Sequence, residues 1–248
     1  MADRDTRLDR YLVSRGLFPT RARARDAILR GTVEVDGRGV SKPSQHIASG
    51  TKVVIRDEAQ PYVSRAALKL KHALDHFGIG ISGRLALDIG ASAGGFTQLL
   101  LERGARGVIA LDVGHGQLAS VLRDDPRVQL LEGLNARELT SADLPEMPDL
   151  IVCDVSFISL KLALPPALAL ARPGALLIAL IKPQFEAGRA AVAGSGIIRD
   201  AAVHRRICDD ITRWLAAVPD WRVIGVVASP IMGADGNAEF LIAAEKHP

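Results

Sequence analysis

The feature that most constrains this chain is an alternation of short apolar runs and helical patterns from residue 84 to its end. Apolar runs bounded by turn residues predict buried strands, and their alternation with helices predicts a doubly wound α/β sheet. We expect strands at residues 85–89, 107–111, 128–131, 150–155, 175–181, 222–228 and 240–244. Helices are expected at residues 64–77, 95–103, 159–171 and 201–216. Sheets of this kind bind ligands at the carboxyl ends of their strands.

A glycine-rich turn follows the first strand, with the sequence Asp88-Ile-Gly-Ala-Ser-Ala-Gly-Gly-Phe96. Glycines at this place let the backbone approach a nucleotide closely. A dinucleotide fingerprint needs Gly-x-Gly-x-x-Gly, and Ser92 breaks that spacing. A carboxylate at Asp88 would repel a pyrophosphate but would suit the ammonium group of a methionine moiety. The turn therefore predicts an S-adenosylmethionine site, with a generic glycine turn as the plainer alternative.

The second and third strands add polar residues at the same edge of the sheet. Asp112 lies 24 residues after Asp88, where an acid can bind both hydroxyls of an adenosine ribose. Asn135 follows the third strand, and we expect it near the adenine. The predicted cofactor-binding residues are Asp88, Gly90, Ser92, Gly94, Gly95, Phe96, Asp112 and Asn135.

Four charged residues stand where apolar patterns stop. Asp154 and Lys182 end apolar runs, Glu239 begins the last strand, and Lys69 lies on the helix before the first strand. A charge beside five apolar residues is partly desolvated, so it needs a partner or a chemical task. A structural ion-pair network is the alternative, but four such residues at the cofactor edge favour a catalytic site.

Residues 1–56 are basic, with 12 Lys and Arg against six Asp and Glu, whereas the other 192 residues hold 19 against 22. This asymmetry predicts a nucleic-acid partner for the amino-terminal part, a solvated charged face being the alternative. Helical spacing of Leu8, Tyr11 and Leu12 predicts one helix, and Thr20 caps a second at residues 21–30. A hairpin around Asp36-Gly37 follows, with a last strand at residues 52–55. The predicted RNA-binding residues are Arg7, Arg15, Arg21, Arg23, Arg25, Arg30 and Arg65.

Other patterns argue against several classes of protein. Two cysteines cannot build a metal cluster, and His72 and His76 have ligand spacing without an evident third ligand, so we predict no metal site. The most membrane-like window, residues 163–181, contains Pro165, Pro166 and Arg172, and no signal peptide precedes it. We therefore expect a cytoplasmic protein. Gly194-Ser195-Gly196 is a candidate mobile lid.

The amino-terminal pattern resembles the S4 RNA-binding domain, through its arginine-rich second helix and its Val-Asp-Gly hairpin. Nearly the whole chain is similar to the TlyA (hemolysin A) family, which joins an S4 domain to an FtsJ/RrmJ-like ribose methyltransferase. The matching motifs are Ser64-Arg-Ala-Ala-Leu-Lys-Leu70, Asp88-Ile-Gly-Ala-Ser-Ala-Gly-Gly-Phe-Thr97, Asp154-Val-Ser-Phe-Ile-Ser159, Ile181-Lys-Pro-Gln-Phe-Glu186 and Gly236-Asn-Ala-Glu-Phe240.

The resemblance implies a Rossmann-like class I methyltransferase fold with an antiparallel last strand. It implies that Lys69, Asp154, Lys182 and Glu239 form a catalytic tetrad that methylates a cytidine 2′-hydroxyl of 16S and 23S ribosomal RNA. In that scheme Lys182 serves the 2′-oxygen as base or electrostatic partner, and Asp154 orients it. Lys69 disfavours protonation of Lys182, and Glu239 fixes the ribose or Lys69. The expected domains are residues 1–57, a linker at 58–63, and residues 64–248.

The sequence departs from the family at two places. Ala66-Ala67 replaces the usual Gly-Gly before the first lysine, and the linker lacks the tryptophan of some members. Three alternatives are an NAD-dependent oxidoreductase, a membrane-active cytolysin and an RNA-binding protein with an inactive enzyme domain. The glycine spacing, the prolines in the apolar window and the complete tetrad argue against them in turn.

Overall fold

The computed structural model describes residues 6–187, 196–233 and 235–247, which form two compact units. The first unit covers residues 1–61 and the second covers residues 62–248. Each unit has a hydrophobic core of its own. Gly194 and Ser195, two residues of the candidate lid, lie outside the described residues.

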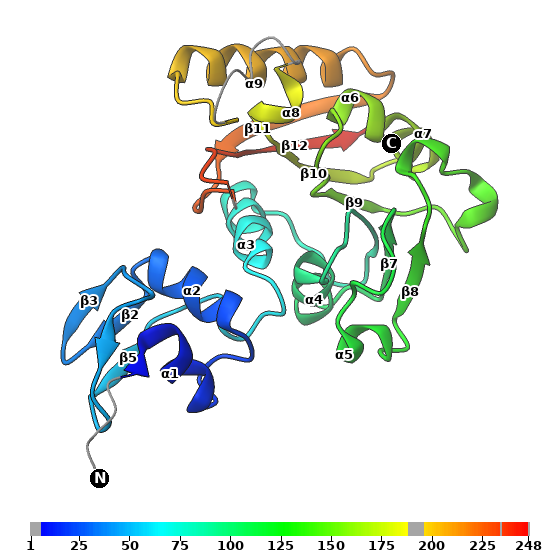
Figure 1. Ribbon diagram of the computed structural model, residues 1–248. Coiled ribbons are helices and arrows are strands. Elements are labelled where there is room, and N and C mark those ends of the chain that lie inside the picture. The colour runs from blue at the N-terminus through cyan, green and yellow to red at the C-terminus, as the bar shows by residue number, and fades with distance from the viewer. Residues whose placement is uncertain (1–5, 188–195, 234, 248) are drawn as a thin grey trace. The chain divides into compact units, whose positions relative to one another are not determined.

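The first unit packs two helices against a small sheet (Figure 1). The helices are α1 (Leu8–Ser14) and α2 (Arg21–Leu29), and the Thr20 side chain caps α2 as the sequence predicts. The sheet has the order β3-β2-β5, and a separate two-stranded pair joins β1 to β4. The strands are β1 (Thr6–Arg7), β2 (Val33–Val35), β3 (Arg38–Val40), β4 (His46–Ile47) and β5 (Val53–Ile55). The apolar positions of both helices are buried against this sheet, which leaves the arginines of α2 on its outer faces.

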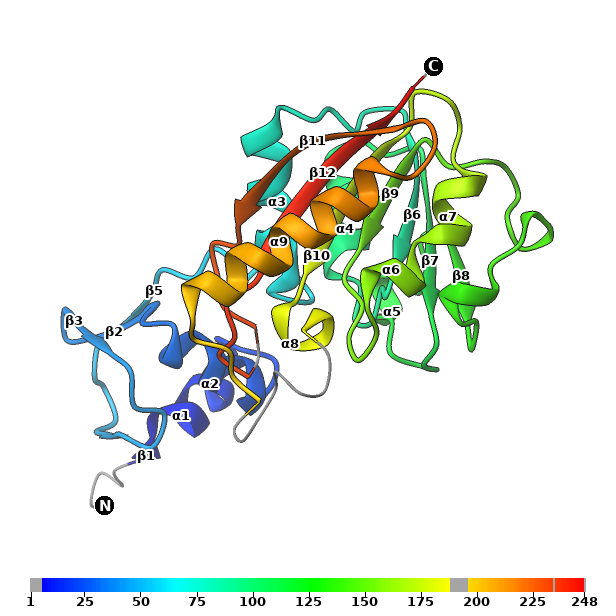
Figure 2. The same cartoon turned by 90° about the horizontal axis from the view of Figure 1, so that it is seen from above.

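The second unit is built on a seven-stranded sheet with the order β11-β12-β10-β9-β6-β7-β8 (Figure 2). The strands are β6 (Leu85–Ile89), β7 (Gly107–Asp112), β8 (Val128–Glu132), β9 (Leu150–Cys153), β10 (Leu176–Ile181), β11 (Trp221–Ala228) and β12 (Phe240–Lys246). The last strand, β12, runs antiparallel to both of its neighbours. This is the mixed sheet of class I methyltransferases, so the predicted fold class is confirmed.

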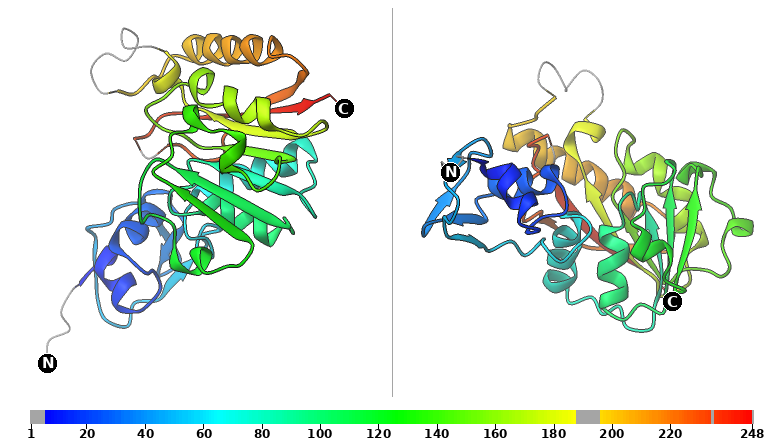
Figure 3. Two further views of the ribbon diagram at one scale, coloured as in Figure 1. Left: turned by 90° about the vertical axis from the view of Figure 1, so that its right-hand side faces the viewer. Right: turned by 60° about the horizontal axis from the view of Figure 1, so that its bottom comes forward.

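Helices cover both faces of this sheet (Figure 3). One face carries α3 (Ala66–Phe77) and α4 (Gly95–Glu102), and the other carries α6 (Leu160–Ala163), α7 (Pro165–Leu170) and α9 (Ala201–Ala216). The interior strand β6 is buried along its whole length, because both of its faces are covered. Strands of this kind need continuous apolar sequence, and that is the signal the sequence contains.

Several expected elements differ at their ends, since β12 extends to Lys246 and α3 begins at Ala66, and two differences bear on the site. The helix expected at residues 159–171 is two short helices, because Pro165 has no N–H to donate and starts a new helix at its first position. The strand expected at residues 150–155 ends at Cys153, which frees Asp154 from the strand. Two four-residue helices, α5 (Ser120–Arg123) and α8 (Pro183–Glu186), are too short to show a helical period in the sequence.

Candidate active site

A pair of opposite charges forms the first part of the candidate site. β9 and β10 are parallel neighbours, and each is followed by a charged residue, Asp154 and Lys182 respectively. Because both strands end at the same edge, the two side chains meet there, with Lys182 Nζ 2.6 Å from Asp154 Oδ1. Lys182 Nζ also donates a hydrogen bond of 2.9 Å to Ser156 Oγ.

A second pair extends the first. Lys69 on α3 places its Nζ 2.6 Å from Glu239 Oε2 and 3.9 Å from Asp154 Oδ2. The four predicted tetrad residues therefore lie in the order Lys182, Asp154, Lys69, Glu239, with alternating charge. Their side chains are 9, 15, 8 and 3% exposed, so the charges are almost removed from water. A buried charge is tolerated only when it is paired, and each member has an opposite charge beside it.

Two adjoining cavities open beside these charges. The larger has a volume of about 330 Å³, and the smaller has a volume of about 170 Å³. Gly90, Ser92, Asp154 and Ser156 line both of them. The larger cavity is also lined by Asp112, Gln117, Asn135 and Phe157, and the smaller by Ser64, Gly95, Phe96 and Lys182. The structure thus joins the predicted cofactor edge to the predicted tetrad.

The glycine turn fits closely against its surroundings. Gly90 has φ +82°, and a Cβ there would lie 2.7 Å from the Asp154 carbonyl oxygen. Any side chain would therefore push the turn away from the strand end that carries the tetrad carboxylate. Gly94, with φ +96°, lines neither cavity, and a Cβ on it would collide with the Leu122 side chain. Gly94 therefore serves the packing of the turn, whereas Gly90 forms the cavity wall.

The polar groups at the end of β7 hold the turn in place. Asp112 Oδ2 accepts a 2.8 Å hydrogen bond from the Ser92 N–H, and its Oδ1 accepts a 2.7 Å bond from the Gly114 N–H. Ser92 Oγ donates to Gln117 Oε1 at 3.1 Å. Asn135 Oδ1 accepts from the Arg137 N–H at 3.1 Å. Each carboxylate oxygen of Asp112 has a further lone pair, so this residue can still accept from a ligand hydroxyl.

Asp88 lies behind the turn and not on the wall of either cavity. Its side chain is fully buried, and its Oδ2 accepts a 2.6 Å hydrogen bond from Thr97 Oγ1. Its Oδ1 has no hydrogen-bond partner among the described residues. Burial raises the pKa of this carboxyl to about 7, although the Thr97 hydroxyl opposes the shift.

Sequence reasoning did not single out Gln117 and Phe157, which line the larger cavity, nor Ser156 and Glu186. Ser156, which binds Lys182, stands two residues after Asp154, and that short spacing was the available signal. Glu186 at the end of α8 accepts a 2.5 Å bond from Ser159 Oγ and a 2.8 Å bond from the Leu160 N–H. Glu186 thereby ties the loop after β9 to the segment after β10. Its pKa is raised by burial, and nothing in its sequence spacing indicates this contact.

The predicted RNA-binding arginines have different surroundings. Arg30 donates to both oxygens of Asp57, at 2.8 and 2.7 Å, and Arg23 donates to the Ala59 carbonyl at 2.9 Å. These two side chains fasten residues 57–59 to α2. Arg7 and Arg21 share Asp9. The other three are Arg15 with its guanidinium 5.3 Å from the Tyr11 ring centroid, Arg25 exposed on α2, and Arg65 immediately before α3.

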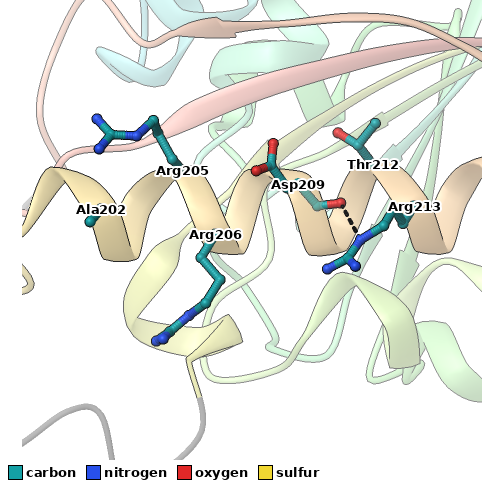
Figure 4. A pocket seen from close by; sticks show the side chains of 6 residues that line it. All are labelled: Ala202, Arg205, Arg206, Asp209, Thr212 and Arg213. Atoms are coloured by element: carbon teal, nitrogen blue, oxygen red, sulfur yellow. Dashed lines mark hydrogen bonds between the residues drawn. The ribbon is translucent and has the colours of Figure 1, made fainter.

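A separate hollow lies along the outer side of α9 (Figure 4). Arg205, Arg206 and Arg213 project from this one helix, and Asp209 stands between them. None of its lining residues lines the two cavities beside the tetrad. Among the described residues, no group of three or more His, Cys, Asp or Glu side chains could hold a metal ion. The described residues also contain no helix that is both long and apolar enough to cross a membrane.

Comparison with known proteins gives two matching families. The model of the FtsJ-like methyltransferase family matches residues 62–246, and that of the S4 domain matches residues 6–53. The chain is 43% identical over 240 residues to the 16S/23S rRNA (cytidine-2′-O)-methyltransferase TlyA of Mycobacterium tuberculosis, covering 96% of this chain and 89% of the relative. Hemolysin A of Brachyspira hyodysenteriae is 40% identical, with 95 and 98% covered. The solved structure of a candidate hemolysin from Streptococcus thermophilus has a TM-score of 0.77 and 39% identity, with 99% of this chain and 90% of that one covered.

Proposed function

The chain belongs to the TlyA (hemolysin A) family of FtsJ-like methyltransferases with an S4 domain, and on this premise we propose that it methylates the ribose 2′-hydroxyl of cytidine in 16S rRNA, 23S rRNA or both. S-adenosylmethionine is the methyl donor of this family. The observation that carries the proposal is the buried chain of alternating charges beside the glycine turn. The substrate in the cell would be a ribosomal subunit in the cytoplasm.

The walls of the two cavities fit S-adenosylmethionine. Gly90 lines both cavities, and its lack of a Cβ lets the turn lie close against the Asp154 carbonyl oxygen. Asp112 presents carboxylate oxygens to the larger cavity, where a ribose diol would bind. Asn135 and Phe157 would border the adenine. When bound, the donor supplies a methyl group on a sulfonium centre, which already has a good leaving group.

The residues of this chain then have to prepare the acceptor oxygen. A ribose hydroxyl is a poor acid, so negative charge developing on its oxygen needs a positive group beside it. Lys182 lines the smaller cavity and would supply that group, while Asp154 and Ser156 hold its Nζ in place. Lys69 would bridge the carboxylates of Asp154 and Glu239, so that the buried charges balance. Fixing the oxygen in line with the methyl group accounts for much of the expected acceleration.

The test is to map ribose methylation on rRNA treated with the purified protein. Small subunits, large subunits and naked 16S and 23S rRNA would each be incubated with S-adenosylmethionine, digested, and analysed by mass spectrometry. We expect 2′-O-methylcytidine in at least one of the four samples and no methylation of bases. Methylation of a base, or no transfer to any of the four RNAs, would contradict the proposal.

A further inference from the structure

Asp9, which the sequence analysis did not single out, has an unusual place in the first unit. It lies in the first turn of α1 and is fully buried. Arg7 donates from Nε to Asp9 Oδ1 at 3.1 Å and from Nη2 to Oδ2 at 3.0 Å. Arg21 donates from its Nη2 to the same Oδ2, also at 3.0 Å. One carboxylate therefore brings together an arginine just before α1 and the first residue of α2.

Each of the two arginine side chains is held by Asp9 and remains partly exposed to solvent. Their side chains are 35 and 48% exposed, whereas that of Asp9 is 0% exposed. A guanidinium has five N–H donors, and Asp9 accepts two from Arg7 and one from Arg21. Two cations on one buried anion leave a local excess of one positive charge. The remaining donors belong to side chains whose positions are already set.

Arg23 on α2 and Arg30, the C-cap residue of that helix, differ from this pair. The Nη atoms of Arg30 meet the two oxygens of Asp57, and Arg23 donates to the Ala59 and Gln60 carbonyls. The Arg30 side chain is only 16% exposed. Both side chains are engaged in holding residues 57–60, so they offer less to an external ligand than Arg7 and Arg21.

We propose that Asp9, Arg7 and Arg21 form a preorganised clamp for one phosphodiester group of the RNA substrate, with Asp9 as the positioning residue. The proposal rests on the proposed function only in taking RNA as the partner. A guanidinium matches the geometry of phosphate oxygens in a forked pair of hydrogen bonds, and a phosphodiester carries the single negative charge that balances this cluster. Because the arginine side chains are already ordered, less conformational freedom is lost when RNA binds.

For Asp9→Asn, the clamp predicts a change in RNA affinity opposite in sign to the change that a simple basic patch predicts. Asp9→Asn removes a negative charge, so a patch that attracts RNA by charge alone would bind more tightly. In the clamp the same change releases both guanidiniums, and RNA affinity would fall about five- to tenfold. Glu34→Gln is the matched control, because Glu34 is in the same unit and its carboxylate pairs with the exposed Arg56.

The measurement is a titration of fluorescently labelled 16S and 23S rRNA transcripts with the full-length protein at several salt concentrations. We expect weaker binding and a shallower salt dependence for Asp9→Asn, with unchanged or tighter binding for Glu34→Gln. An Asp9→Asn protein that binds RNA as tightly as the wild type, or more tightly, would overturn the clamp. Methylation by the wild type is read separately, so failure of the proposed function is distinguishable from failure of the clamp.

A second pair of variants tests the clamp without changing Asp9, so the result does not depend on whether Asp9→Asn folds. Arg21→Lys and Arg38→Lys keep the charge of two exposed arginines of the first unit, of which Arg21 lies on α2 and Arg38 on β3. Lysine cannot reproduce the fork, so Arg21→Lys should weaken RNA binding several-fold, while Arg38→Lys changes it less than about twofold. Equal effects of the two substitutions would contradict the clamp. Hydrogen exchange of the α1 and α2 amides, measured on each variant, shows whether the first unit is folded.

Discussion

Asp9 in the first unit and Asp88 in the second are both fully buried aspartates, yet their surroundings act on their charge in opposite directions. Hydrogen bonds from Arg7, and then from Arg21, lower the pKa of Asp9 to about 2 against the opposing effect of burial. Burial raises the pKa of Asp88 to about 7, because Thr97 offers it only a hydroxyl and Asp154 adds a like charge. The two carboxyls differ in the cations that touch them and in their depth, because partly exposed arginines cover Asp9 whereas Asp88 lies inside the second unit.

The second unit also contains carboxylates that are ion-paired with cations. Asp154 and Glu239 have lysines at 2.6 Å, as Asp9 has arginines at 3.0 Å. Two uses of buried charge therefore occur in one chain. In the first unit the cations are partly exposed, whereas in the second both lysines are almost enclosed and Lys182 lines a small cavity.

The largest effect on activity is expected when the Asp154 carboxylate loses its partner Lys182. Lys182→Ala should lower the rate of methyl transfer by about 10²–10³-fold, as expected for loss of the group that stabilises the acceptor oxygen. Affinity for S-adenosylmethionine, measured by calorimetry, should be nearly unchanged. Lys161→Ala is the control, since Lys161 is also ion-paired, with Asp210, but lines neither cavity. Loss of donor binding in Lys182→Ala would count against the assignment.

The uncompensated carboxyl of Asp88 should make stability depend on pH. Its pKa is about 7 in the folded chain and about 4 when unfolded, so the folded state holds the extra proton between these values. The stabilisation is therefore complete below about pH 4 and is lost as the pH rises to 7, by on the order of 4 kcal/mol at most.

Asp88→Asn removes that titration, so the unfolding free energy of the wild type should fall relative to that of the variant as the pH rises from 4 to 7. Both tryptophans of the chain, Trp214 and Trp221, lie in the second unit. Tryptophan fluorescence during urea denaturation therefore reports on this unit alone. If wild type and Asp88→Asn differ in unfolding free energy by the same amount at every pH, the pKa of Asp88 is not raised and the contrast with Asp9 fails.

A smaller effect on the free energy of unfolding, with the opposite dependence on pH, is expected at Asp9. Its pKa is lowered on folding, so its stabilisation is present above about pH 4 and is lost as the pH falls towards 2. Asp9→Asn should destabilise the first unit by about 2 kcal/mol at pH 7, the value of charged hydrogen bonds at a partly exposed pair. Faster hydrogen exchange in α1 and α2 at pH 7 measures this loss. Unchanged exchange would mean that the arginines do not depend on Asp9.

The smallest effect is expected at Glu186, whose carboxylate accepts two hydrogen bonds but has, among the described residues, no arginine pair like that of Asp9. Burial raises its pKa, while the Leu160 N–H and the Ser159 hydroxyl lower it. Glu186→Gln keeps one acceptor oxygen, so we expect a loss of about 1 kcal/mol in stability and a severalfold fall in kcat. Glu138→Gln, at an exposed position, controls for the loss of charge. A fall in kcat as large as that of Lys182→Ala would place Glu186 in direct contact with the substrate.

The local patterns of the sequence predicted most of the fold. The boundaries of β6 and α9 match the expected ones, because both segments have a strong period and clear end signals. The same reasoning joined residues 159–171 into one helix, since the apolar spacing continues through Pro165. It also missed α5 and α8, because four residues are too few to show a period.

For the candidate site, charged residues beside apolar patterns identified all four members of the charged chain: Asp154 and Lys182 after strands, Glu239 before a strand and Lys69 on a helix. Their pairing could not be predicted, because Lys69 and Glu239 are 170 residues apart and meet only when α3 packs beside β12. The same limit applies to the arginines of α2. Their spacing shows a basic helix, but only packing shows that Arg30 faces Asp57 and Arg21 faces Asp9.

The sequence alone therefore determined the strands, the glycine turn, the basic amino-terminal unit and the types of chemical group at the strand ends. These features are local, since they depend on side-chain period, glycine conformation and charge within short segments. The tertiary structure decided which charges touch, which carboxyl has a cation and which glycine forms a cavity wall. Those outcomes depend on distances between segments far apart in the chain, and the effect of a buried charge changes steeply with such distances.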